Sequence, residues 1–323
     1  MPTPYRLQLI GPSGYCINQE AALRGLAYLQ HHFCVLNPQV IERRFQRFAG
    51  TDTERLDDLN QLTQLPRLPD IVLAIRGGYG ASRLLPLLDY SGLKKALHAK
   101  PTVICGHSDF TAIQLALLAC SALTTFSGPM LAGNFGANPP CEWSLLQFNS
   151  LISQPEYQIR WQSEQSCHLQ ASGVIWGGNL TLICSLIGTP WMPQINHGIL
   201  VIEDIGEHPY KIERMLLQLH YAGILKNQKV IIAGDFTDST ANNYDNGYDL
   251  SVVWQTIETL SGVKIITGLP FGHEQRTVTL PIGAQGTLVC DDGQCLLTLR
   301  NYPHVTGSDS PLENRLMPKR LRL

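Results

Sequence analysis

The sequence predicts an α/β protein with two domains, an N-terminal domain on a mostly parallel sheet and a C-terminal domain rich in β-strands. The chain has 323 residues, about twice the length of a typical domain. Short apolar runs alternate with helix-like segments in its first part, which is typical of parallel strands joined by crossover helices. Beyond residue 170, apolar runs recur with one clear helix among them.

Two strand–turn–helix units dominate the first part. Residues 71–75 and residues 102–105 are apolar runs that each stop at a glycine turn, and the helix-like segment 110–119 follows the second turn. A short apolar run that stops at glycine indicates the end of a buried strand. An earlier helix is expected to begin at Thr51, because Glu54 stands three residues later, the spacing of a capping box.

Residues 136–170 are expected to connect the two domains, which would then span residues 1–135 and 171–323. This segment contains three prolines and a polar run, which are signals of a connection. In the second domain a helix is expected to begin at Pro209, since proline suits the first helical position. The expected strands lie at 198–202, 229–233 and 263–266, with a hairpin at 287–299.

Composition excludes several classes of protein. Hydrophobic residues make up 44% and charged residues 15% of the chain, which excludes an intrinsically disordered protein. The net charge of -2 argues against nucleic acid or an anionic membrane as a partner. The start lacks the pattern of a secretory leader, and no apolar stretch is long enough to span a membrane. We therefore expect a cytoplasmic protein that acts on a small molecule.

The nine cysteines are scattered without metal-binding spacing, so a zinc cluster is not expected, nor is any other cofactor or metal. Disulfides are not expected either, because a cytoplasmic compartment is reducing. Cys290 and Cys295 flank an Asp292-Gly293 turn and could face each other across a hairpin.

Ser108 is the candidate nucleophile. It lies on the sharp turn between a strand and a helix, where a side-chain oxygen is exposed and helix amides point toward it. The full nucleophile-elbow pattern fails because Phe110 occupies the last glycine position. The alternative is that Ser108 only caps the helix.

A serine needs a base and an orienting acid. His273 follows the strand that ends at residue 266, at the edge where α/β sheets bind ligands. A packing role for His273 is the alternative, and the competitor His107 is expected to point away from its neighbour Ser108. For the acid we choose Glu203, which stands where an apolar strand stops.

Two other acids close to that strand end, Asp204 and Glu207, are alternatives to Glu203. The oxyanion of an acyl-transfer reaction also needs donors. The backbone amides of Asp109 and of Gly78, on the glycine turn of the neighbouring strand, are the candidates. That turn lacks the spacing of a phosphate-binding loop.

Six separated motifs together resemble the serine LD-carboxypeptidases. They are RGGYGASRLLP at 76–86, GHSDFTA at 106–112, TFSGPM at 125–130, WGGNL at 176–180, EDIGEHPY at 203–210 and GHEQR at 272–276. The resemblance covers nearly the whole chain and keeps the order of the family. It implies a triad of Ser108, His273 and Glu203, with the active site between the two domains.

The resemblance also implies an activity and its setting. The expected enzyme removes the terminal D-alanine from a murein tetrapeptide, free or linked to muropeptide, in peptidoglycan recycling, and it acts as a homodimer. Arg76 is a candidate for binding a carboxylate, or else forms a structural salt bridge. Trp176 and Asn179 are candidates for lining the substrate cleft. A hydrolase of peptide-nucleotide antibiotics and a non-catalytic muropeptide-binding protein are the alternatives.

Overall fold

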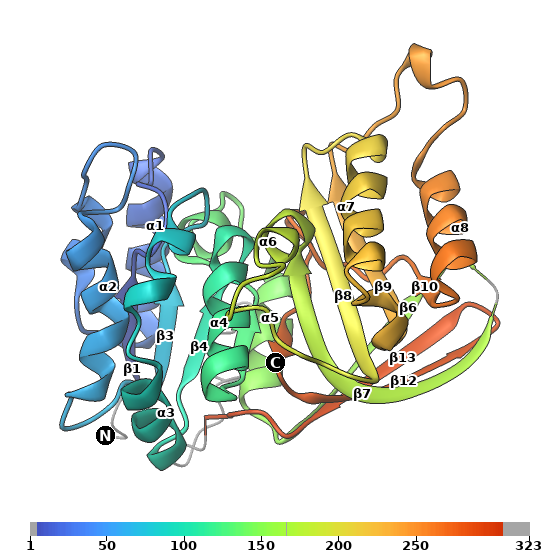
Figure 1. Ribbon diagram of the computed structural model, residues 1–323. Helices are drawn as coiled ribbons and strands as arrows, with labels where there is room; N and C mark the ends of the chain where they lie inside the picture. The colour runs from blue at the N-terminus through green and yellow to red at the C-terminus, as the bar shows by residue number, and fades with distance from the viewer. Residues whose placement is uncertain (1–4, 166, 306–323) are drawn as a thin grey trace, which may run out of the picture.

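A computed structural model describes residues 5–165 and 167–305 and contains two β-sheets, each associated with helices (Figure 1). The mixed α/β class and the two-part architecture predicted from the sequence are confirmed. No helix in the described part of the chain is long and apolar enough to cross a membrane.

The first sheet has the strand order β11-β5-β4-β3-β1-β2 and is parallel except for β11, which runs antiparallel to β5. All residues of β3 and β4 are buried, as expected of strands with helices on both faces. The strands are β1 (Arg6–Ile10), β2 (Cys34–Val35), β3 (Ile71–Ala74), β4 (Val103–Gly106), β5 (Thr125–Ser127) and β11 (Leu280–Ile282).

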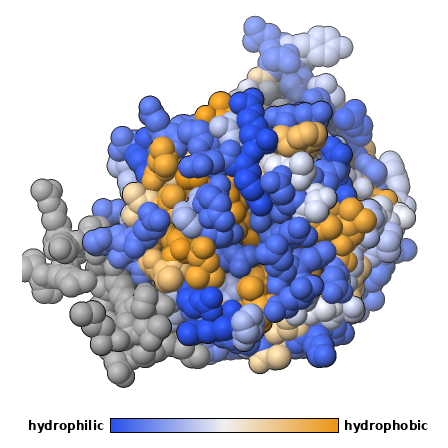
Figure 2. All heavy atoms as spheres, turned by 90° about the vertical axis from the view of Figure 1, so that its left-hand side faces the viewer, coloured by the Kyte–Doolittle hydropathy of each residue, from blue (hydrophilic) through white to orange (hydrophobic). Residues whose placement is uncertain are grey.

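Five helices accompany this sheet: α1 (Gln19–His32), α2 (Asp52–Asn60), α3 (Tyr90–Ala99), α4 (Thr111–Ser121) and α5 (Glu142–Ile152). The predicted capping box is confirmed, because the Thr51 hydroxyl accepts from the Glu54 amide and the Glu54 carboxylate accepts from the Thr51 amide. The face of the molecule that carries α1 and α2 is mostly polar with separate apolar patches (Figure 2), which is ordinary for a protein surface.

The second sheet has the order β10-β9-β8-β7-β12-β13-β6, parallel from β10 to β7 and antiparallel from β7 to β6. Its strands are β6 (Glu156–Gln162), β7 (His168–Asn179), β8 (Gly198–Ile205), β9 (Gln228–Thr237), β10 (Lys264–Ile266), β12 (Gln285–Asp291) and β13 (Gln294–Arg300). The associated helices are α6 (Leu180–Ser185), α7 (Pro209–Tyr221) and α8 (Leu250–Ser261). The predicted start of α7 at Pro209 is confirmed.

The expected connection at 136–170 is not a plain linker. It contains α5, whose apolar face is buried, and β6, which pairs with β13 at the edge of the second sheet. The prolines precede these elements and therefore do not interrupt them. The expected second domain also returns one strand, β11, to the first sheet. The domain limits stay a prediction, and residues 306–323 lie outside the described part.

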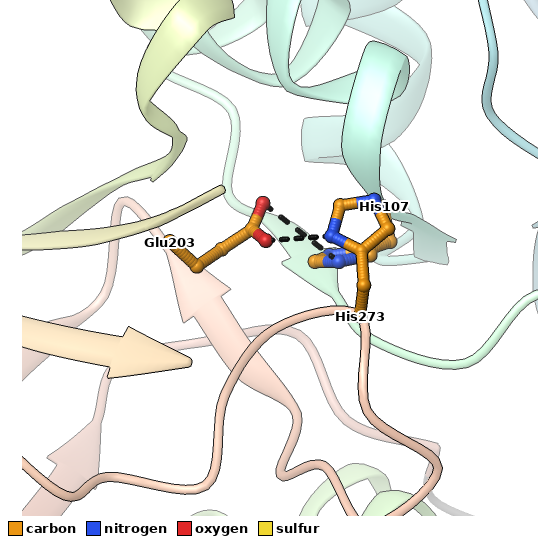
Figure 3. A group of neighbouring side chains, drawn as sticks. All are labelled: His107, Glu203 and His273. Atoms are coloured by element: carbon orange, nitrogen blue, oxygen red, sulfur yellow. Dashed lines mark hydrogen bonds and ion pairs between the residues drawn. The ribbon is translucent and has the colours of Figure 1, made fainter. Parts of the chain in front are cut away.

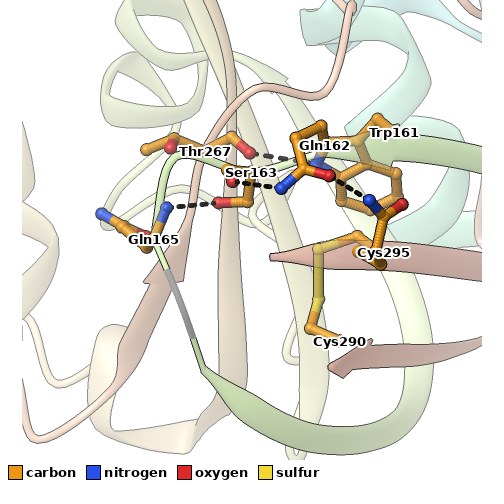
Figure 4. Close-up of a disulfide and its surroundings, with 8 residues drawn as sticks. Trp161, Gln162, Ser163, Gln165, Thr267, Cys290 and Cys295 are labelled. Atoms are coloured by element: carbon orange, nitrogen blue, oxygen red, sulfur yellow. Dashed lines mark hydrogen bonds between the residues drawn. A yellow bond between two sulfur atoms is a disulfide. The ribbon is translucent and has the colours of Figure 1, made fainter. Parts of the chain in front are cut away.

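The expectation that disulfides are absent is wrong for Cys290 and Cys295. The hairpin places them directly opposite each other on β12 and β13, with 4.3 Å between their Cα atoms, and a disulfide joins them (Figure 4). The turn between them brings this about, since Asp292 and Gly293 both have positive φ, as a two-residue hairpin requires. Both sulfur-bearing side chains are buried.

We predict that the bridge stabilises the hairpin without contributing to activity. Reductant should lower the free energy of unfolding by about 2 kcal/mol, the loop-entropy value for so short a loop, and should leave turnover unchanged. The measurement is thermal unfolding and turnover with and without reductant. The Cys290→Ala/Cys295→Ala protein, which has no bridge to lose, is the control and should not respond. Complete alkylation of both thiols without reductant would contradict the bridge.

Candidate active site

Ser108 occupies a strained turn directly after β4. Its φ of 63° lies in the left-handed region, which a non-glycine residue adopts only where the surroundings impose it. The space beside it depends on glycine: a Cβ on Gly77 would lie 2.8 Å from Ser108 Cβ and 3.0 Å from its Oγ. Ser108 does not cap α4, because Phe110 holds that position and makes no side-chain cap bond. The local geometry is that of a nucleophile elbow.

Phe110 replaces the expected last glycine of the elbow without opening it. Its ring lies over Gly106, where a side chain would collide with it. The close approach of α4 to β4 therefore depends on Gly106, which precedes Ser108. It does not depend on a glycine after Ser108.

Asp109 ties the two turns of the first sheet together. Its carboxylate accepts from the backbone N–H of Ala81 at 2.9 Å, and the side chain is buried. Burial raises the pKa of this carboxyl. The Asp109 amide nitrogen lies 3.3 Å from the point that a Cβ on Gly77 would occupy. This amide and the glycine turn after β3 therefore lie next to Ser108.

Glu203 and the partly buried His273 form a pair beside this turn (Figure 3). Glu203 is fully buried near the end of β8, and its Oε2 accepts from His273 Nδ1 at 2.7 Å. Burial alone would lower the His273 pKa, but the hydrogen bond and charge of Glu203 outweigh it and raise this pKa. An imidazole with a carboxylate on Nδ1 keeps one tautomer and leaves Nε2 for a reacting group.

The alternative acids have other partners. Asp204 accepts from Asn179 Nδ2 at 2.9 Å and from the amide and hydroxyl of Thr181. Glu207 pairs with Lys211 at 3.1 Å on the first turn of α7. Of the three acids, Glu203 is the one that contacts His273.

The loop 267–279 carries His273 and is fastened from two directions. The amide of Asp235 on β9 donates to Phe271 O at 2.7 Å. Ser144 on α5 accepts from the amide of Thr277 and donates to Gln275 O, both at 2.8 Å. The segment expected as a linker therefore supplies a helix that positions the histidine loop.

His107 lies beside the Glu203–His273 pair, which we did not predict from the sequence. Its Nε2 lies 3.8 Å from Glu203 Oε1 and its ring centroid 4.7 Å from that of His273. Burial lowers the pKa of His107 to about 4, although the Glu203 charge opposes this. The inward orientation of His107 could have been predicted from the sequence, because a residue at the end of a fully buried strand has little contact with solvent.

His107, Glu203 and His273 offer ligand atoms that all lie within 4.8 Å of one another. Imidazole and carboxylate are ligands that zinc accepts. Within this group, His273 Nδ1 and Glu203 Oε2 are joined by a hydrogen bond.

Arg76 follows β3 on the glycine turn and keeps much of its guanidinium available. Its Nη1 donates to Tyr15 O at 3.1 Å, and it forms no ion pair with another residue of 5–165 or 167–305, so the structural salt bridge is not found. Gly78 has a φ of 107°, and a Cβ there would lie 3.4 Å from Arg76 Nη2. The turn therefore brings its backbone and this cation close together.

The structure contradicts the expected cleft-lining positions of Trp176 and Asn179. Trp176 is fully buried, and its Nε1 donates to Gln228 Oε1 at 2.8 Å. Asn179 is 4% exposed, caps α6 by accepting from Leu182 N, and bonds Asp204. The sequence could not reveal which face of β7 these side chains occupy, because β7 is buried on both faces at this end.

Two acids missed by sequence reasoning lie near the Glu203–His273 pair. Burial, with the charges of Glu274 and Glu203, raises the pKa of Asp235 to about 6. Glu274 accepts from the Thr237 hydroxyl at 2.9 Å. The position of Asp235 on the strand next to β8 could have indicated it, since neighbouring parallel strands end at one edge.

Comparison with known proteins gives consistent matches along the chain. Residues 7–128 match the model of the LD-carboxypeptidase N-terminal domain, and residues 172–288 match that of the C-terminal domain. A crystal structure of muramoyltetrapeptide carboxypeptidase from Oxalobacter formigenes is 37% identical with a TM-score of 0.85, covering 92% of this chain and 99% of that one.

Two curated relatives of this chain differ from each other in the function that their names state. The murein tetrapeptide carboxypeptidase of Pseudomonas aeruginosa is 29% identical, over 89% of this chain and 94% of its own length. The microcin C7 self-immunity protein of Escherichia coli is 27% identical, over 85% and 87%. Taken together with the matches to both domain models, these similarities show that the chain is a serine carboxypeptidase and belongs to the LD-carboxypeptidase family.

Proposed function

We propose that this enzyme removes the terminal D-alanine from murein tetrapeptides, with Ser108 as nucleophile, His273 as general base and Glu203 as the orienting acid. The observation that carries the proposal is the 2.7 Å contact between His273 Nδ1 and the fully buried Glu203 Oε2 next to the strained Ser108 turn. Such a pair can take the proton of a serine and stabilise the imidazolium that forms.

The proposed reaction has two stages. Ser108 Oγ attacks the carbonyl of the L-centre before D-alanine while its proton passes to His273 Nε2, and the amides of Asp109 and Gly78 bind the oxyanion. His273 then protonates the leaving amine, and D-alanine departs. Water, deprotonated by His273, cleaves the acyl-enzyme and restores Ser108.

Arg76 is proposed to bind the free carboxylate of the D-alanine. A carboxypeptidase must distinguish a chain end from a chain interior, and a guanidinium binds a carboxylate through paired hydrogen bonds. Support comes from the position of Arg76 on the glycine turn and from its lack of an ion pair in the described part of the chain.

The family resemblance is the basis on which we place the reaction in the cytoplasmic recycling of murein fragments by a homodimer, and the names of the relatives support the murein substrate. A second candidate function is the cleavage of a peptide-nucleotide conjugate, because the microcin self-immunity protein is 27% identical over most of this chain. Incubating the purified protein with a defined murein tetrapeptide and identifying the products by mass tests the first function against the second.

We predict that Ser108→Ala and His273→Ala each lower turnover by about 1,000-fold or more, as loss of a triad member does. Glu203→Gln should also be severe, because the carboxylate that contacts His273 would lose its charge. Glu207→Gln is the matched control and should be mild. Turnover is measured beside thermal unfolding, and a greater loss in the Glu207 variant would contradict the choice of acid.

We predict cleavage of the tetrapeptide, poor cleavage of the pentapeptide with one more D-alanine, and none of an all-L peptide. The scissile carbonyl must meet Ser108 and both oxyanion donors at once, which suits one chirality. Arg76→Ala should raise KM for the tetrapeptide, whereas Arg160→Ala, at an exposed position of β6, should not. Equal rates on tetrapeptide and pentapeptide would refute chain-end recognition.

We predict that kcat/KM rises with pH through a pKa above 6.5, the ordinary value for histidine. His273 acts as a base only when neutral, and Glu203 stabilises its charged form, so activity is lost as pH falls through the raised pKa. Glu203→Gln removes that charge and should move the acid limb of the profile to lower pH. Glu207→Gln should leave it in place; an unmoved limb in the Glu203 variant would argue against the pairing.

A further inference from the structure

The two oxygens of the Glu203 carboxylate have different surroundings. Oε2 accepts from His273 Nδ1, whereas Oε1 has no hydrogen-bond partner in the described residues although it is fully buried. The polar atom facing Oε1 is Nε2 of His107 at 3.8 Å, which is also buried and also without a partner there. Buried polar atoms are rarely left unsatisfied, so two such atoms facing each other indicate an interaction.

Packing alone does not explain a histidine at this position. The His107 ring lies between Phe271, at 5.8 Å between ring centroids, and His273, at 4.7 Å. A phenyl ring would fill the same space without burying two nitrogens. The imidazole therefore has a polar role.

The other nitrogen of the ring indicates which polar role this is. His107 Nδ1 lies 3.2 Å from the hydroxyl of Ser127, a buried residue of β5. With the Ser127 hydroxyl donating to Nδ1, the neutral ring carries its hydrogen on Nε2, directed at Glu203. The low pKa of His107 keeps the ring neutral at physiological pH, so it supplies a donor without a charge.

We infer that His107 is a positioning residue that holds the far oxygen of Glu203, so that the near oxygen stays on His273 Nδ1. This inference rests on the proposed serine-peptidase function. His107 acts through Glu203 and does not itself react with the substrate. A carboxylate held at both oxygens cannot rotate away from the general base when the imidazolium forms, and part of its charge is drawn to the second imidazole.

The expected change in the pH dependence of activity follows from the charged groups around the Glu203–His273 pair. Asp204 beside Glu203 on β8 and Glu274 next to His273 both favour the charged imidazole. Asp235 on β9 interacts with Glu203 and Glu274. His107 is the uncharged donor of the group. Without it, more negative charge remains on Glu203, and the His273 pKa should rise further.

The decisive variant is His107→Phe, which keeps the ring packing and removes the donor. We expect it to lower kcat about tenfold, the scale of a lost hydrogen bond to a charged group, with KM within about twofold of wild type. The acid limb of kcat/KM should move to higher pH. His107→Gln, which can place an amide N–H near Glu203, should recover much of kcat and shift the limb less. His220→Phe on α7 is the control.

Four outcomes decide the inference. The inference is supported if His107→Gln recovers much of kcat and the acid limb of His107→Phe moves to higher pH. Recovery of kcat by His107→Gln supports it also where thermal unfolding shows that His107→Phe is destabilised. Wild-type kcat and pH profile in His107→Phe overturn it. Equal losses in both His107 variants with an unmoved acid limb show a packing role and overturn it as well. Full activity of Ser108→Ala would instead refute the proposed function, which separates the two failures.

Discussion

Glu203 carries a carboxylate that is fully buried between the two sheets, and a buried charge of this kind is tolerated only with partners. The partner His273 comes from a loop that returns to the first sheet as β11. The requirement to satisfy one carboxylate therefore links β8 to the histidine loop and to the edge of the sheet that carries Ser108. The contacts of Ser144 and Asp235 to that loop keep this pair in place.

The strained turn at Ser108, like the buried carboxylate of Glu203, is stabilised by the residues around it. A left-handed φ at serine costs energy that packing must offset, and three features supply the offset. Gly77 leaves room for the side chain, Gly106 admits the ring of Phe110, and Asp109 fixes the adjacent turn through Ala81. The strain is thus confined to Ser108, whereas the groups that stabilise the strained turn belong to both strand–turn–helix units, the one after β3 and the one after β4.

The sequence was informative where chemistry coincides with strand ends. Ser108, Glu203 and His273 could be chosen because each follows an apolar run, and the family resemblance pointed to the same three. The sequence was uninformative where the role of a residue depends on the direction in which its side chain points. Trp176 was expected in a cleft and lies in the core, and the position of His107 beside Glu203 was not expected. Which face of a doubly buried strand a side chain occupies depends on the partner sheet, which no local pattern contains.

Long-range pairing was also beyond sequence reasoning. The short run of β11 has little signal of its own, and its partner β5 lies far away in the chain. This pairing has a consequence for biosynthesis. Domains generally fold as they emerge from the ribosome, N-terminal part first, yet the first sheet lacks its edge strand until residue 282 has been made. A nascent chain that carries only the serine half therefore has neither a finished sheet nor a base for its nucleophile, so hydrolytic competence arises only after residue 282 has been made.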